Sequence, residues 1–150
     1  MSNIPCTFTI SSGQAGGKLS GGFPKQGGGF YPPLSGPQLE KDDTLTVSVE
    51  HPDAASAPQK LTGIFVFSAG PTVPRQPKAS PFVDEHGHVR CLQRLTADKG
   101  VANGKTLYTF APFTYRGGSD GHYELTFVAE NSAAIPPIQW AEDPEFDTGN

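Results

Sequence analysis

The sequence predicts an all-β protein, an antiparallel immunoglobulin-like β-sandwich of seven to nine strands joined by long Gly/Pro-rich loops. Glycine contributes 18 and proline 15 of the 150 residues, a composition that disfavours long helices and supplies turns. Apolar and polar residues alternate with the two-residue period of a strand in several short segments. Finally, a polar turn at Ser119-Asp120-Gly121 runs directly into such an alternating segment. A chain of this length is most simply one domain, so residues 1–150 are expected to form a single sandwich.

The segment 119–127 is typical of the tyrosine corner of a sandwich. Tyr123 stands at the entrance of the predicted strand, and its phenol is expected to bond a backbone group just upstream. Leu125 and Phe127 follow at intervals of two and are expected to face the core, together with Phe65 and Phe67.

The remaining strands are predicted from the same alternation. Residues 6–10 form a first strand, and the Gly/Pro-rich residues 12–37 cannot sustain a ladder for long. Residues 44–50 form a half-buried strand. Residues 61–69 are apolar on both faces, which favours a strand near the centre of the fold.

The second half of the chain contains two predicted hairpins. One spans residues 82–92 and turns at His86-Gly87, and the other turns at Asn103-Gly104, which is the stronger turn signal. The last predicted strands cover residues 107–115 with a break at Pro112, residues 122–129, and residues 138–140.

The net charge of −4 comes entirely from the C-terminal end. Four acids lie in the last ten residues, and without them 11 acidic side chains balance 11 basic ones. This end is expected to be a solvated acidic terminus. A body without basic excess argues against nucleic acid as a partner, and against binding to an anionic membrane surface.

Residues 1–20 lack a cationic start followed by an apolar run, and no stretch reaches the length of a membrane span. We therefore expect a cytoplasmic protein. Cys6 and Cys91 are expected to be two small buried hydrophobes, although a disulfide across the sandwich is the alternative.

Reactive motifs are weak. Gly117 to Gly121 has the letters of a nucleophile elbow around Ser119, but a strand follows where the elbow requires a helix. Asp84, His86 and His88 would share one face of an unbroken strand and could bind a metal. Since Gly87 is expected to turn the chain, we interpret them as polar residues of a hairpin tip. No cofactor, metal site or catalytic residue is predicted.

Aromatic side chains next to polar loops point to binding instead. The candidate ligand-binding residues are Trp140, Tyr115, Arg116, Tyr31 and Asp143. Flat apolar faces beside polar groups suit a sugar ring or an extended peptide, although aromatic residues of a small sandwich commonly just fill its core.

The C-terminal part carries a resemblance. Residues 123–129, Tyr-Glu-Leu-Thr-Phe-Val-Ala, and residues 139–146, Gln-Trp-Ala-Glu-Asp-Pro-Glu-Phe, resemble the end of the AidA/PixA inclusion-body protein family, where a similar strand precedes an aromatic–Trp–Asp–Pro element. Here Ala141 and Glu142 separate the tryptophan from Asp143-Pro144. The resemblance implies a bacterial β-sandwich without established enzymatic activity, linked to crystalline inclusions and host association, with sugar binding suggested.

The functional prediction is therefore a non-enzymatic binding or self-assembly module. Its expected partners are a carbohydrate or a protein surface, with a second copy of the chain as a further partner. A structural or decoration subunit of a larger assembly is one alternative. A serine hydrolase that uses Ser119 with His122 or another histidine is the other.

Overall fold

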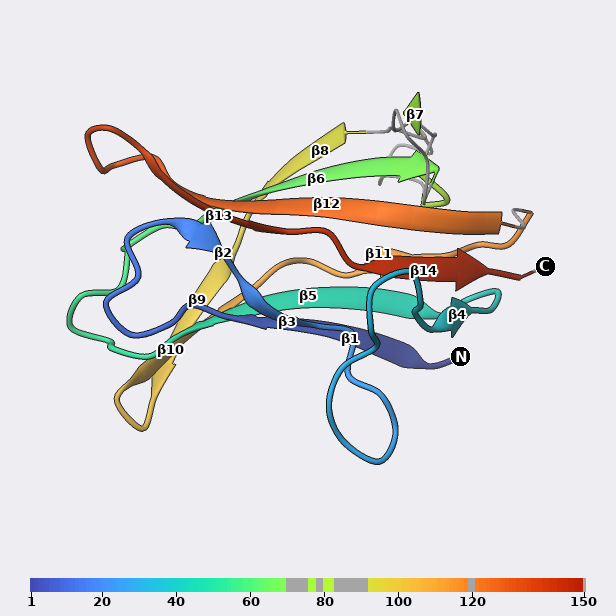
Figure 1. Cartoon of the computed structure of the whole chain (residues 1–150), viewed down its shortest axis with the longest axis horizontal. Coiled ribbons are helices and arrows are strands. Elements are labelled where there is room, and N and C mark those ends of the chain that lie inside the picture. Colours follow the sequence, from blue (N-terminus) through green and yellow to red (C-terminus); the bar gives the residue numbers. More distant parts are fainter. Residues whose placement is uncertain (70–75, 78–79, 83–91, 119–120, 150) are drawn as a thin grey trace.

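A computed structural model describes residues 1–69, 76–77, 80–82, 92–118 and 121–149, and within them the chain is an all-β sandwich of two packed sheets (Figure 1). Strands account for all regular structure in this part of the chain. It accordingly contains no helix with the length and apolarity needed to cross a membrane. The prediction of an all-β sandwich is confirmed.

The first sheet has six strands. Its order is β3 (Ser20–Gly22), β1 (Asn3–Thr9), β5 (Thr44–His51), β10 (Lys105–Thr109) and β9 (Asp98–Ala102), with β11 (Phe113–Thr114) also beside β5. The predicted turn at Asn103-Gly104 is confirmed, because both residues have positive φ (54° and 75°) and join β9 to β10 by a two-residue loop.

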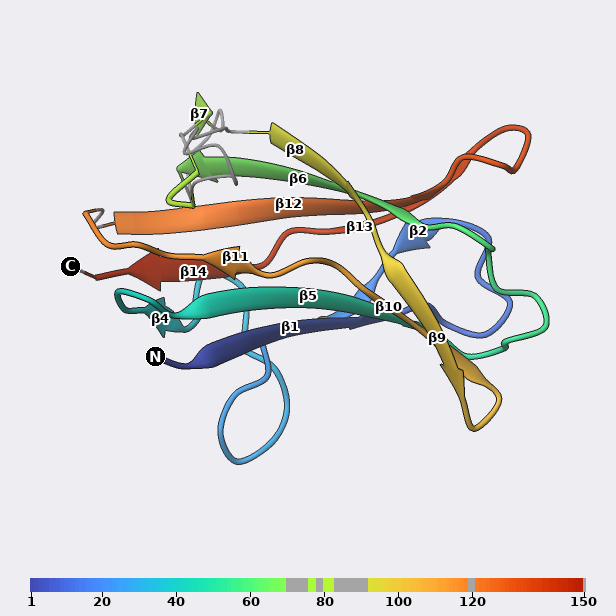
Figure 2. The same cartoon turned by 180° about the vertical axis from the view of Figure 1, so that it is seen from behind.

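The second sheet has eight strands centred on β12 (Gly121–Asn131). Along one side of β12 lie β13 (Ile138–Glu142) and β14 (Glu145–Thr148). Beyond them, β2 (Gly17–Lys18) pairs with β13, and β4 (Gln38–Leu39) pairs with β14. Along the other side of β12 lies β6 (Thr62–Ala69), which also pairs with β7 (Gln76–Pro77) and β8 (Leu92–Thr96). Figure 2 shows β8 leading into β9 as the chain passes from this sheet to the first one.

Two details of the predicted architecture are wrong. The described residues form 14 strands rather than seven to nine, since frequent glycine and proline leave five of them only two or three residues long. The sheets are also not wholly antiparallel, because β1 and β5 pair in parallel from Asn3↔Thr44 to Thr9↔Glu50. The long connection between these strands returns the chain to the end of the sheet where it started.

The acidic end is a strand rather than a solvated terminus, which corrects a further prediction. β13 and β14 follow β12 in one continuous register, from Asn131↔Ile138 to Gly121↔Thr148. Pro144 interrupts the ladder because proline has no N–H, while its carbonyl still accepts the N–H of Leu125 at 2.9 Å. Phe146, the one apolar residue of β14, is fully buried and reaches the core from an acid-rich segment.

Aromatic rings fill the space between the sheets. Phe8 on β1 stacks on Phe127 on β12 with ring centroids 5.2 Å apart, and Phe65 contacts Phe127 at 5.0 Å. The predicted core residues Phe65, Phe67, Leu125 and Phe127 are all fully buried. Tyr123 is buried and stacks on Phe146 at 5.3 Å. The backbone bond expected for its phenol stays a prediction.

Cys6 is a buried free thiol, as expected of a small hydrophobe. Burial raises its pKa well above the ordinary value, with a further contribution from the charge of Glu142. Several predictions fall on residues outside the described part: the turn at His86-Gly87, the group Asp84, His86 and His88, Cys91, and Ser119.

Candidate functional site

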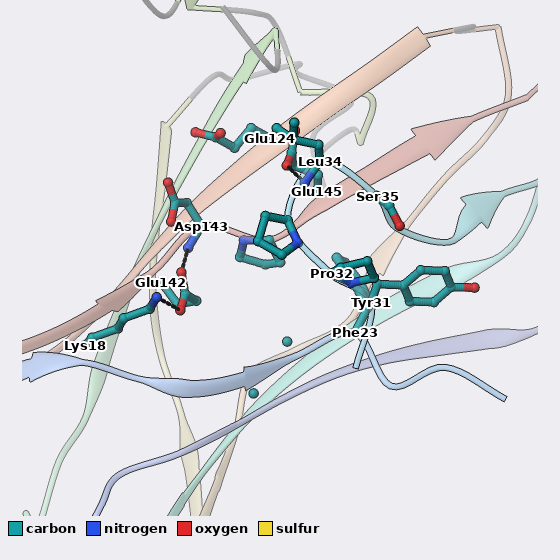
Figure 3. Close-up of a pocket in the computed structure, with 14 residues that line it drawn as sticks. Lys18, Phe23, Tyr31, Pro32, Leu34, Ser35, Glu124, Glu142, Asp143 and Glu145 are labelled. Carbon is teal, nitrogen blue, oxygen red and sulfur yellow. Dashed lines mark hydrogen bonds and ion pairs between the residues drawn. The ribbon is translucent and has the colours of Figure 1, made fainter. Parts of the chain in front are cut away.

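A pocket of about 370 Å³ opens where the junction of β13 and β14 faces the chain that follows β3 (Figure 3). β12 and the segment from β13 to β14 contribute Glu124, Glu142, Asp143, Pro144 and Glu145. The N-terminal part of the chain contributes Lys18 of β2, Gly21, Gly22, Phe23 and residues 31–35. The break that Pro144 makes in the ladder therefore lies in the pocket wall.

One wall of the pocket is acidic. Glu124 and Glu145 are directly opposite each other on β12 and β14, and their exposed fractions are only 3% and 5%. Glu142 pairs with Lys18 at 3.5 Å, and among the described residues Lys18 is the only cationic one that lines the pocket. Four acidic residues thus line the cavity, and the one cationic side chain among its described lining residues is itself largely exposed.

The other wall is the loop 31–35, which β14 holds in place. The backbone N–H of Leu34 donates to Oε2 of Glu145 at 2.6 Å, and Leu34 adopts a positive φ of 71°. Gly36 lies so close to the backbone of Glu145 that a Cβ atom at this position would overlap its carbonyl. The N–H of Tyr31 donates to the carbonyl of Phe23 at 2.9 Å. The loop is consequently fixed at both ends.

His122 forms a clasp with two carboxylates next to this pocket. Its Nδ1 lies 2.6 Å from Oδ1 of Asp147, and its Nε2 lies 2.9 Å from Oε1 of Glu145. Partial burial lowers the pKa of His122, but the hydrogen bonds to Glu145 and Asp147 and the charges of both acids outweigh burial, so that the pKa lies above 6.5. The arrangement stabilises an imidazolium that donates from both nitrogens.

The clasp does not have the arrangement of a metal centre. No group of three or more His, Cys, Asp or Glu side chains that could hold a metal ion occurs within the described residues. What the pocket offers chemically is a concentration of hydrogen-bond acceptors, with prolines and two aromatic residues beside them.

The structure brings two of the five predicted binding residues together. Tyr31 and Asp143 both line the pocket, although they lie more than one hundred positions apart in the sequence. Trp140 and Tyr115 are core residues, exposed by 3% and 0%, so neither ring offers a free face to a ligand. Trp140 lies on β13 and Tyr115 directly follows β11, and both side chains belong to the hydrophobic core. Arg116 is exposed and pairs with Asp42 at 3.2 Å, outside the pocket lining.

Sequence reasoning missed most of the acidic wall and the clasp. Glu142 and Glu145 were visible as part of an acid-rich end, and His122 and Glu124 as polar positions of a predicted strand. Alternation placed His122 and Glu124 on the face away from the core, but it could not show that a loop from residues 31–35 covers that face. Only the register of β12 with β14 sets His122 opposite Asp147 and Glu124 opposite Glu145.

Comparison of the chain with models of known protein families finds no match. Comparison with curated protein sequences likewise finds none.

Proposed function

We propose that this protein is a non-enzymatic, lectin-like binding module whose pocket beside Pro144 takes a carbohydrate. The observation that carries the proposal is the set of four acidic residues, Glu124, Glu142, Asp143 and Glu145, that line one cavity. Sugar hydroxyl groups are hydrogen-bond donors, and charge-assisted bonds to carboxylates are about twice as strong as bonds between neutral groups.

The rest of the lining fits the same ligand class. Pro32, Pro33 and Leu34 supply apolar surface next to the acids, and Tyr31 adds an aromatic residue. A sugar presents both hydroxyl groups and apolar C–H faces, so it needs both kinds of surface. The cavity volume of about 370 Å³ lies within the range of about 300–1,000 Å³ found for small-molecule sites.

The clasp argues against the hydrolase alternative. A general base needs a nitrogen lone pair directed at the nucleophile. Both ring nitrogens of His122 are instead bonded to carboxylates, and the surrounding acids favour the protonated ring. This geometry supports a binding role for the site over activation of Ser119.

The test is a glycan array followed by isothermal titration calorimetry with any sugar retained. Asp143→Asn keeps the size of the side chain but removes its charge, and we expect at least about tenfold weaker binding, since hydrogen bonds to charged groups contribute about 1.5–3 kcal/mol. Asp98→Asn is the matched control, because Asp98 is exposed on β9 and does not line the pocket. An array on which no glycan is retained, or equal affinity in Asp143→Asn and wild type, would refute the proposal.

A further inference from the structure

We propose that His122 is a proton-operated latch for the pocket loop 31–35: its protonated ring holds Glu145 in the position where that carboxylate binds Leu34, and loss of the proton releases the loop. The latch itself needs no ligand. Only its effect on affinity rests on the proposed carbohydrate site.

The geometry provides a direct relay from the ring to the loop. Nε2 of His122 lies 2.9 Å from one oxygen of Glu145, and the other oxygen of the same carboxylate accepts the N–H of Leu34 at 2.6 Å. Leu34 lines the pocket, so one carboxylate connects the titrating ring to the pocket wall. At 5% exposure, Glu145 has little access to water that could replace either bond.

Protonation decides whether both bonds of the ring can exist. A protonated imidazole donates from both nitrogens, whereas a neutral one carries one N–H and one lone pair. In the neutral ring, either Glu145 or Asp147 would face that lone pair at less than 3 Å. The bond to Asp147 is the shorter of the two, 2.6 Å against 2.9 Å, so we assign the remaining proton to Nδ1, and Glu145 is the carboxylate that loses its donor. Glu145 must then shift, since two acceptors at this separation repel each other.

The described charged groups around the ring all have the same sign. Glu145 and Asp147 face it from β14, and Glu124 lies two residues along β12 on the same face of the sheet. The next strand beyond β14 contributes Gln38 and Leu39, which carry no charge, and the described residues opposite this part of β12 on β6 are Ser68 and Ala69. Acidic neighbours favour the charged ring, in agreement with its raised pKa.

Release of Glu145 would remove the acceptor from the N–H of Leu34. This residue is held at a positive φ of 71°, a conformation that a leucine adopts only when surrounding contacts impose it. Without the bond, we expect the loop to relax and the pocket to lose its present shape. Affinity for a pocket ligand should therefore fall as pH rises through the pKa of His122, and by linkage a bound ligand should raise that pKa further.

The latch can be tested by NMR on the ligand-free protein. The ¹H and ¹⁵N shifts of the Leu34 amide are followed between pH 5 and pH 9, together with the ring signals of His122, at about 0.2-unit steps that resolve a single titration. We expect the Leu34 amide to move with the same midpoint as the ring. His122→Gln keeps a side-chain donor but has no proton to lose, so this transition should vanish.

His51→Gln is the control, because His51 accepts the N–H of Asp53 in a different loop and should leave the Leu34 titration unchanged. A Leu34 amide whose shifts stay constant while His122 titrates would overturn the inference. So would an unchanged Leu34 transition in His122→Gln. The wild-type titration needs no variant to fold, and failure to find a sugar would not affect it, so the two proposals fail separately.

Discussion

Phe127 provides the most direct test of the core, because its ring joins the two sheets. It is fully buried on β12 and contacts Phe8 at 5.2 Å, Phe65 at 5.0 Å and Phe110 at 5.5 Å. Phe127→Ala removes a whole ring from this cluster. Truncation of a buried phenylalanine to alanine costs about 3–5 kcal/mol, and the ring contacts on three sides place Phe127 in the upper half of that range.

Single-domain proteins are stable by only about 5–15 kcal/mol, so Phe127→Ala should leave a marginally folded protein. Phe127→Leu keeps most of the apolar volume and loses chiefly the ring contacts, each worth about 0.5–1.5 kcal/mol. A double-mutant cycle of Phe8→Leu with Phe127→Leu should yield a coupling energy in the same range, since these two rings stack across the sheets.

Urea unfolding followed by the fluorescence of Trp140, the only tryptophan and a buried one, measures these differences. Phe30→Ala is the control, because Phe30 is 46% exposed and its truncation should cost less than about 1 kcal/mol. If Phe127→Ala shifts the midpoint no more than Phe30→Ala does, Phe127 does not lie between the sheets and the proposed packing is wrong.

Three further predictions concern two glycines, a buried hydroxyl and the clasp. Gly21→Ala should be more destabilising than Gly28→Ala by about 1 kcal/mol or more. Both glycines have φ of 110°, but a Cβ atom at Gly21 would overlap the carbonyl of Thr7, whereas a Cβ atom at Gly28 meets no other atom. Equal denaturation midpoints of the two variants would contradict this. Tyr115→Phe should lower the unfolding free energy by about 1 kcal/mol, because the hydroxyl of Tyr115 donates to the carbonyl of Gly149 at 2.7 Å inside the core. An unchanged urea midpoint would mean that this hydrogen bond contributes nothing. Because the pKa of His122 is raised in the folded protein, the clasp stabilises the fold fully below about pH 6.5, and this contribution is lost as pH rises through the folded-state pKa. His122→Gln should lack this pH dependence. Identical curves of stability against pH for the variant and the wild type would show that the clasp is not formed.

Much of the fold followed from local sequence. Alternation located β1, β5 and β12, because a strand with one face in the core must repeat every two residues, and a segment that is apolar on both faces located β6. Asn103-Gly104 identified its hairpin since these residues tolerate the positive φ that a two-residue turn demands. Neither signal depends on distant parts of the chain.

The acidic end was not predicted as a strand because its four acids indicated a solvated terminus. Residues 145–148 read Glu-Phe-Asp-Thr, a strand pattern with a single apolar residue. Burial of Glu145 becomes tolerable only because the N–H of Leu34 and the ring of His122 bond its two oxygens. These two partners lie 111 and 23 residues away from Glu145 along the chain, so the sequence around Glu145 does not reveal them.

The sequence by itself determined the class of this protein, since its glycine and proline content and its two-residue periodicity are properties of short segments. Tertiary structure alone decided that β1 pairs in parallel with β5, that Trp140 and Tyr115 face the core, and that Tyr31 meets Asp143 in one pocket. These outcomes depend on strand register and on loops that bring distant segments together. The free energy that selects them comes from closing the whole sandwich, which no window of the sequence contains.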